Sequence, residues 1–343
     1  MSPPESQRRT STDAELAPAR WTRRVAWLLC GVTFPLLWVG GLVTTTKSGM
    51  AVPDWPATYG YNLLLYPWTT WIFGPWDLFV EHGHRLLGML SGLVTILLLM
   101  MFYKYETRPW IKTVGVVALV AVIAQGVLGG LRVVLDERLL AMVHGSAGPL
   151  FFVLTVAIVV WTSRTWLTAQ RNDQQSLVRL ATLATATGVL VYVQMVVGAM
   201  LRHMPVTVSP YSFESVVKVH LLLAGMVLLL TLLVARMALA TDAPTGVRRT
   251  GWAMLLVVVA QITLGLATWV SKYGVPVWAR SMYPVATKSV LADGWTQAHI
   301  VTAHQAVGSV LLATLVVSAM LAWRYAPETI TQTDSLPTGV ATG

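Results

Sequence analysis

Residues 81–101 read EHGHRLLGMLSGLVTILLLMM, and this stretch decides the class of fold. It opens with a carboxylate, two imidazoles and a guanidinium, and no Asp, Glu, Lys or Arg occurs from Leu86 to Tyr103. A helix needs roughly 20 consecutive apolar residues to cross the hydrocarbon core of a bilayer. The stretch therefore predicts a membrane-spanning helix with polar groups, which are costly to bury, at its N-terminal end.

Seven further stretches of similar length lack charged residues. Only 11% of the 343 residues are charged, against about 25% in soluble proteins, and the alternation typical of a β-barrel is absent. We therefore expect an all-α integral membrane protein with eight transmembrane helices. The expected spans are Val25–Thr46, Leu86–Tyr103, Thr113–Leu131, Leu139–Ser163, Leu180–Leu201, Val219–Ala235, Thr250–Ser271 and Gly294–Trp323.

The distribution of Lys and Arg predicts the orientation, because basic residues concentrate in cytoplasmic loops. With eight spans, both termini lie on one side, and that side holds 15 of the 24 basic residues. We expect cytoplasmic termini and a location in a bacterial inner membrane, in contact with membrane lipid. The net charge of +9 follows from this topology and indicates no nucleic acid partner.

A repeat divides the chain into two halves. Three odd-numbered spans carry Gln-x-x-x-Gly, and three even-numbered spans carry His-x-x-x-Gly, at Gln125, Gln194, Gln261, His84, His144 and His304. His220 in the sixth span is followed by Ala224 and Gly225, a near match. The pattern indicates a duplication, with an N-terminal tail (1–24), an N-terminal four-helix half (25–163), a cytoplasmic linker (164–179), a C-terminal four-helix half (180–324) and a polar C-terminal tail (325–343) that we expect to be disordered.

Four histidines lie at similar depth in this scheme, as two pairs: His84 with His144, and His220 with His304. Ionisable residues inside a span are expensive and usually functional. Two histidines on facing helices, flanked by small residues that make room for a planar macrocycle, suit axial ligation of haem iron. Zinc or copper is the rival, although the cysteine and carboxylate partners usual for such sites are mostly missing.

Other polar residues near the span ends are candidates for supporting roles. Five cations are candidate partners of haem propionates, although for any one of them alone a snorkelling side chain is the simpler explanation: Arg85, Arg132, Arg138, Arg202 and Lys218. His299 ranks second to His304 as a ligand, and His203 is expected in a solvated loop. His82 lies about 200° around the helix from His84, so both cannot face one iron.

Glu81 breaks the symmetry of the two halves. It shares a helical face with His84, whereas the matching position before His220 is Val217. A surface ion pair with Arg85 is the simplest alternative. The asymmetry indicates that one haem is held while the other is acted upon.

Four segments resemble the haem A synthase family across essentially all eight spans: GGLVTTTKSGMAVPDWP (40–56), EHGHRLLG (81–88), MVHGSAG (142–148) and AHQAVG (303–308). The resemblance implies two four-helix bundles related by a pseudo-twofold axis. It implies oxidation of the C8 methyl of haem O to a formyl group, giving haem A for terminal oxidases, with Glu81 as the catalytic residue. His84 and His144 would bind the substrate haem, and His220 and His304 would bind a haem b cofactor.

The implied partners are haem O synthase and an electron donor such as ferredoxin. One departure concerns the first outer loop, where many members carry a cysteine pair and residues 46–80 contain none. Trp68, Trp71 and Trp76 in this loop are expected as interfacial anchors, and the segment around Asp54 is a candidate cover for the substrate haem.

Two other functions remain open on the sequence. A di-haem membrane electron carrier of the cytochrome b type accommodates the four histidines equally well but leaves Glu81 without a role. A transporter with duplicated halves predicts a site near the bilayer midplane, whereas the polar residues here lie near one end of the spans.

Overall fold

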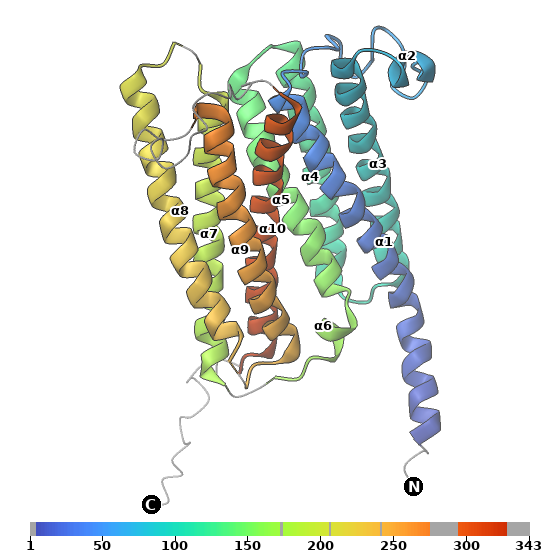
Figure 1. Ribbon diagram of the computed structural model, residues 1–343. Coiled ribbons are helices and arrows are strands. Elements are labelled where there is room, and N and C mark those ends of the chain that lie inside the picture. The colour runs from blue at the N-terminus through green and yellow to red at the C-terminus, as the bar shows by residue number, and fades with distance from the viewer. Residues whose placement is uncertain (1–4, 172–173, 206, 241, 275–293, 328–343) are drawn as a thin grey trace, which may run out of the picture.

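The computed structural model describes residues 5–171, 174–205, 207–240, 242–274 and 294–327, and these are helical almost throughout (Figure 1). The helices are α1 (Glu5–Thr45), α2 (Trp68–Ile72), α3 (Trp76–Tyr105), α4 (Pro109–Val134), α5 (Arg138–Trp161), α6 (Arg164–Thr168), α7 (Gln175–His203), α8 (Pro210–Ala238), α9 (Thr245–Tyr273) and α10 (Trp295–Tyr325). The predicted disorder of the C-terminal tail concerns residues that lie almost wholly outside the described ones.

Eight of these helices are long and apolar enough to cross a membrane, namely α3, α4, α5, α7, α8, α9, α10 and the Arg20–Thr45 part of α1. The prediction of an all-α integral membrane protein with eight spans is therefore confirmed. The chain is a multi-pass membrane protein.

Two sequence-based expectations about span ends were wrong. The second span begins at Trp76, so Glu81, His84 and Arg85 lie inside α3 and not at its N-terminal end. The helix extends through these charges because Arg85 pairs with Glu81 one turn away, at 3.0 Å. His203 does not lie in a solvated loop: it is the last residue of α7, and both of its ring nitrogens are buried.

The spans pack as two sets of four. In the first set α3 contacts α1 and α4, and α5 contacts α4 and α1; in the second set α7, α8, α9 and α10 follow one another around a closed ring. Each set has its own apolar core, around Leu98 and Phe102 in the first and around Met254 and Leu315 in the second. Helix α10 joins the sets through contacts with α1 and α5. The pseudo-twofold relation between the sets stays a prediction.

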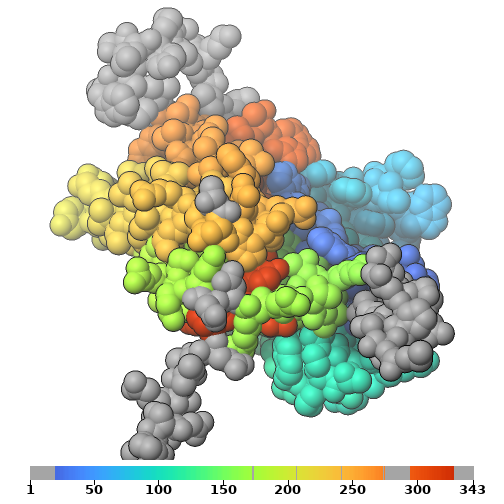
Figure 2. Space-filling model, turned by 90° about the horizontal axis from the view of Figure 1, so that it is seen from below, coloured from blue at the N-terminus to red at the C-terminus, as the bar shows by residue number. Residues whose placement is uncertain are grey.

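The start of α1 and the end of α10 lie at one end of the bundle, which we call the terminal end (Figure 1). The opposite, distal end carries α2, the turn from α4 to α5 and the turn from α7 to α8. Seen from the terminal end, the two sets lie beside each other, with the chain around α6 running between them (Figure 2). The polar residues singled out above all lie toward the distal end.

Candidate functional site

Each of the four paired histidines packs against a glycine on a neighbouring helix. A Cβ atom added to any of these glycines would lie only 2.7–3.2 Å from the imidazole Cε1, so a larger residue would displace the ring. Small residues of this kind allow close approach between membrane helices. The contacts are Gly40 on α1 with His84 on α3, Gly129 on α4 with His144 on α5, Gly198 on α7 with His220 on α8, and Gly265 on α9 with His304 on α10.

The sequence repeat identified three of these glycines but missed Gly40. The first span has Leu36 where the other odd spans have Gln, so the Gln-x-x-x-Gly pattern does not find it. The available signal was the pair Gly40–Gly41 within an apolar span. With Gly40 included, all four His residues have the same type of neighbour.

The ring nitrogens of the four histidines differ in their surroundings. Nδ1 is buried in all four and has no partner within hydrogen-bond geometry. The backbone one turn before the glycine, at Leu36, Gln125 and Gln261, interacts with the rings of His84, His144 and His304. Nε2 makes no hydrogen bond to a described residue and, unlike Nδ1, is not among the buried atoms without a partner, so it is the nitrogen free to bind a metal.

The structure brings together the predicted pairs. The ring centroids of His84 and His144 lie 6.3 Å apart, with planes at 82°. A metal about 2 Å from a nitrogen of each ring, as in zinc–imidazole bonds, requires ring centroids roughly 6 Å apart when the two bonds are collinear. His220 lies close enough to His304 for their charges to interact. Among the described residues no group of three or more of His, Cys, Asp and Glu could hold a metal ion.

The glutamines of the repeat connect the histidine helices to their neighbours. Gln194 donates from Nε2 to the carbonyl oxygen of His220 at 2.8 Å, and the side chain of Gln261 lies against Gly308 on α10. Their Oε1 atoms, and that of Gln125, are buried without a hydrogen-bond partner among the described residues. Buried polar atoms without a partner are rare and point to a missing ligand or water.

Glu81 is buried, with 1% of its surface exposed. Its Oε1 accepts a hydrogen bond from Arg85 at 3.0 Å and lies 4.0 Å from Arg132 on α4. Its Oε2 accepts a hydrogen bond from the backbone N–H of Val52 at 2.9 Å. A carboxylate can be buried at low cost only when charges and donors compensate it, and here both oxygens are compensated.

Arg85 organises the first loop, because it donates three hydrogen bonds to loop carbonyls. Nη1 reaches Asp54 at 2.7 Å and Ala57 at 2.9 Å, and Nη2 reaches Val52 at 2.8 Å. The next loop residue, Trp55, packs its ring directly on Gly130 of α4, which adjoins the glycine beneath His144. The Asp54 segment therefore covers the distal end of the first helix set. The sequence did not indicate the Trp55–Gly130 contact.

The loop turn that follows is held by Asp54, whose carboxylate accepts hydrogen bonds from the N–H groups of Tyr59 and Gly60, at 2.8 and 2.7 Å. Burial raises the pKa of the Asp54 carboxyl, but these donors and the charge of Arg85 outweigh it and hold the pKa below its ordinary 3.8. The turn is therefore stabilised by the ionised carboxylate, and this contribution is lost only as pH falls through the depressed pKa.

The five candidate cations fall into three groups. Arg85 and Arg132 lie beside Glu81. Arg202 is partly buried between the two sets, where it donates to the Gly41 carbonyl and to the Thr45 and Gln305 side chains. Arg138 is exposed, as is Lys218, which pairs with Glu214 at 2.8 Å.

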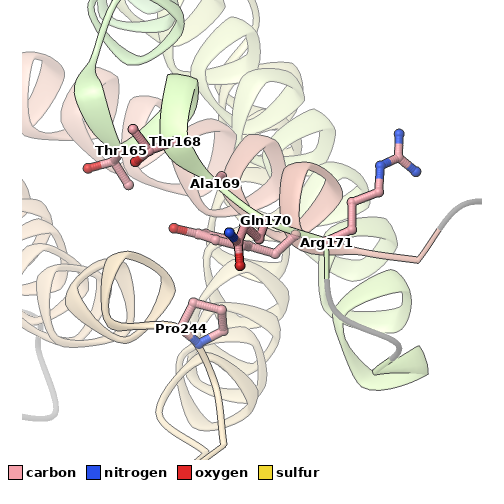
Figure 3. A pocket seen from close by; sticks show the side chains of 7 residues that line it. Thr165, Thr168, Ala169, Gln170, Arg171 and Pro244 are labelled. Carbon is pink, nitrogen blue, oxygen red and sulfur yellow. The ribbon is translucent and has the colours of Figure 1, made fainter. Parts of the chain in front are cut away.

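Arg202 also lines a cavity of about 370 Å³ at the distal end of the second set. The remaining lining residues are apolar except for Lys272: Leu201, Met204, Pro205, Val208, Pro210 and Phe213. A cavity with two cations and an apolar wall suits an amphiphilic anion. A second cavity, of about 740 Å³, lies at the terminal end near α6 and Pro244, and in Figure 3 the guanidinium of Arg171 points away from Pro244.

The competing histidines have other surroundings. His82 is buried, lies 3.1 Å from the Thr58 hydroxyl and contacts Tyr66 and Trp71. His299 stacks between Trp38 and Trp295, whereas His304 is the histidine that faces Gly265. The structure thus places His82 under the first loop and His299 in an aromatic stack.

Comparison with known proteins finds two matches. A family model described as "Cytochrome oxidase assembly protein" (COX15-CtaA) matches residues 75–214, a region that contains Glu81, His84 and His144. A protein of Beijerinckia indica subsp. indica named "Heme A synthase" is 26% identical over 348 aligned positions, which cover 84% of this chain and 95% of that protein. The two matches agree with each other and with the eight-span fold: part of the chain matches the COX15-CtaA family model, and most of its length is similar to a haem A synthase.

Proposed function

We propose that this protein is an oxidoreductase that converts haem O to haem A by oxidising the C8 methyl group to a formyl group. The observation that carries the proposal is the buried, fully compensated Glu81 on the helix of one His pair, with Val217 at the matching position of the other. The resemblance of the chain to a haem A synthase along most of its length supports it. In this proposal each helix set binds one haem, but only the first set, which contains Glu81, acts on its haem.

In this proposal His84 and His144 hold the iron of the substrate haem O, and His220 and His304 hold a haem b cofactor through their free Nε2 atoms. The paired geometry, the glycines beneath the rings and the unpartnered Gln oxygens fit such groups. Oxidation of the methyl carbon to the formyl level removes four electrons and adds one oxygen atom, so the reaction also needs an external oxidant; haem iron would supply the redox chemistry that an unactivated methyl group requires.

Glu81 acts on the substrate in the first set. Its carboxylate accepts a proton or stabilises positive charge that develops at the methyl carbon. Arg85, Arg132 and the Val52 N–H hold its oxygens in place, so little reorganisation is needed during the reaction. Trp55 and the Asp54 segment exclude water from the distal side of this site, since they pack onto α3 and α4.

Arg202 pairs with a propionate of haem b in the second set. It is partly buried, its partners Gly41, Thr45 and Gln305 are all neutral, and an anion would stabilise such a cation. Lys272 lines the same cavity. In contrast, Lys218 is 72% exposed and already has a carboxylate partner.

We place the protein in a bacterial inner membrane with the distal end facing outward and both termini in the cytoplasm. Haem O synthase would supply the substrate, and a donor such as ferredoxin would supply electrons. These assignments follow from the distribution of Lys and Arg and from the chemistry of the proposed reaction.

The test is extraction and mass analysis of the haems that copurify after co-expression with a source of haem O. Haem b together with haem O, a hydroxylated haem or haem A is expected. The second candidate, a di-haem electron carrier, is favoured by the likeness of the four His–Gly contacts. Haem b alone, in both sets and without any modified haem, would support the carrier and refute the synthase.

A further inference from the structure

The first loop contains a long uncharged segment whose apolar side chains face away from the protein. No Asp, Glu, Lys or Arg occurs between Asp54 and Asp77. Within residues 61–73, here called the apolar loop segment, Leu64, Leu65, Trp68 and Phe73 are 63–79% exposed. Apolar side chains gathered in this way usually mark an interaction surface.

The position of α2 shows what lies next to this segment. Trp71 stacks on Phe79 with ring centroids 5.8 Å apart, and its Nε1 donates to the Phe79 carbonyl at 3.0 Å. Helix α2 is thereby attached to the first turn of α3 and projects sideways from the bundle (Figure 1).

The length of α3 sets the depth of that first turn. Its 30 residues extend about 45 Å, which matches the roughly 40–45 Å of a bilayer including its headgroups. The first turn of α3 therefore lies at headgroup level. The exposed apolar side chains of α3, including Leu90, Leu93 and Leu97, continue this surface into the hydrocarbon core.

We propose that the apolar loop segment docks on the membrane interface of the distal leaflet, with Leu64, Leu65, Trp68 and Phe73 inserted between lipid headgroups and acyl chains. Tryptophan and tyrosine favour this region because their rings are amphipathic. Short apolar segments without charges bind there through buried apolar area alone. This inference does not depend on the reaction that the protein performs.

The opposite side of the segment reaches the candidate site. Tyr66 and Trp71 contact the ring of His82 with centroids 5.1 and 5.4 Å apart, and His82 directly follows Glu81. The membrane-docked segment therefore holds the loop against the turn of α3 that carries the catalytic candidate. Contact with lipid therefore helps to hold the Asp54 segment over the distal end of the first helix set.

The experiment uses the full-length chain with Cys30, its single cysteine, replaced by alanine. Leu65→Cys, Phe73→Cys and the control Glu137→Cys, at an exposed and charged position of the same end, each receive an environment-sensitive fluorophore. The proteins are placed in lipid nanodiscs that contain lipids with a nitroxide near the headgroup. Folding is checked by the helical circular dichroism of each variant.

The probes at positions 65 and 73 are expected to be quenched several-fold more by the nitroxide lipid than the probe at 137, and less by aqueous iodide. Adding Leu65→Asp should reduce lipid quenching at position 73, whereas Thr70→Asp on an exposed site of α2 should not. Strong iodide quenching at 65 and 73 would overturn the proposal. Protection from iodide without lipid quenching would also overturn it, because a protein partner or a second copy would then cover the segment.

Discussion

At the scale of single residues, side chains of the same chemical type have different surroundings in this protein. His84 and His82 are two positions apart on α3, yet one faces Gly40 with Nε2 free and the other lies 3.1 Å from Thr58 under the loop. Arg85 and Arg202 are both partly buried cations, but Arg85 has Glu81 as a counter-charge, whereas the partners of Arg202 among the described residues are neutral. The environment decides which of them remains able to bind a ligand.

Glu81→Gln removes the negative charge and keeps the size of the side chain. Both haem sites should persist, while haem A formation falls by about 10²–10⁴, the usual cost of losing an acid–base group. A hydroxylated intermediate is expected to accumulate. The measurement is the haem composition of the purified variant. Normal haem A output would leave Glu81 as a structural anchor for Val52 and Arg85.

His304→Ala should remove haem b, because one of the two imidazoles that would hold the group is lost. His299→Ala should leave haem b in place, since that ring stacks between Trp38 and Trp295. The absorbance spectrum of each purified variant gives the haem b content. Loss of haem b in the His299 variant with retention in the His304 variant would reverse the ligand assignment.

Arg202→Gln should lower the haem b content several-fold and shift its midpoint potential, because the positive charge that would pair with a haem b propionate is lost. Arg202→Lys should restore part of both properties, as it keeps the charge. Lys218→Gln, at an exposed site already paired with Glu214, should behave as the unaltered protein. An unchanged potential in Arg202→Gln would show that this residue only joins the two helix sets.

At the scale of secondary structure, the repeating unit is a pair of helices in which one supplies a glycine and the other a histidine. Helix α1 does more, because its adjacent glycines serve both sets. Gly40 lies against His84, and the Gly41 carbonyl accepts a hydrogen bond from Arg202 on α7. A single turn of α1 thus contacts both candidate sites.

Gly129→Val tests the helix pair of the first set. The new side chain would begin 3.0 Å from Cε1 of His144 and displace the ring, so retention of haem O on purification should fall. Gly126→Val on the same helix is the matched control, since nothing lies within 4 Å of its added Cβ. The readout is haem O bound per protein. Equal retention in both variants would contradict the role of Gly129.

At the scale of the whole molecule, the two helix sets share one membrane but place all candidate groups toward one end. Reporter fusions at Lys104, Arg171 and after Arg324 should report the cytoplasm, and fusions at Asp54 and Val208 should report the outer side. This follows from the excess of Lys and Arg at the terminal end. A reversed result at any one site would break the eight-span topology.

The sequence by itself determined the membrane class, the eight spans, the internal repeat and the histidines that it carries. It did so because a bilayer demands long apolar runs and makes every intramembrane polar residue conspicuous. The limits of α3 and α7 were missed for a related reason: charges such as Glu81 and Arg85 end an apolar run, although they neutralise each other inside the helix.

Only the tertiary structure decided which groups meet. The contact of Gly40 with His84, the ring of Trp55 on Gly130, the hydrogen bonds of Arg85 to loop carbonyls and the place of Arg202 between the sets join residues from different segments. No local pattern encodes such contacts, because they depend on how whole helices pack and not on the period of one helix. The repeat therefore predicted the histidines, and helix packing supplied their surroundings.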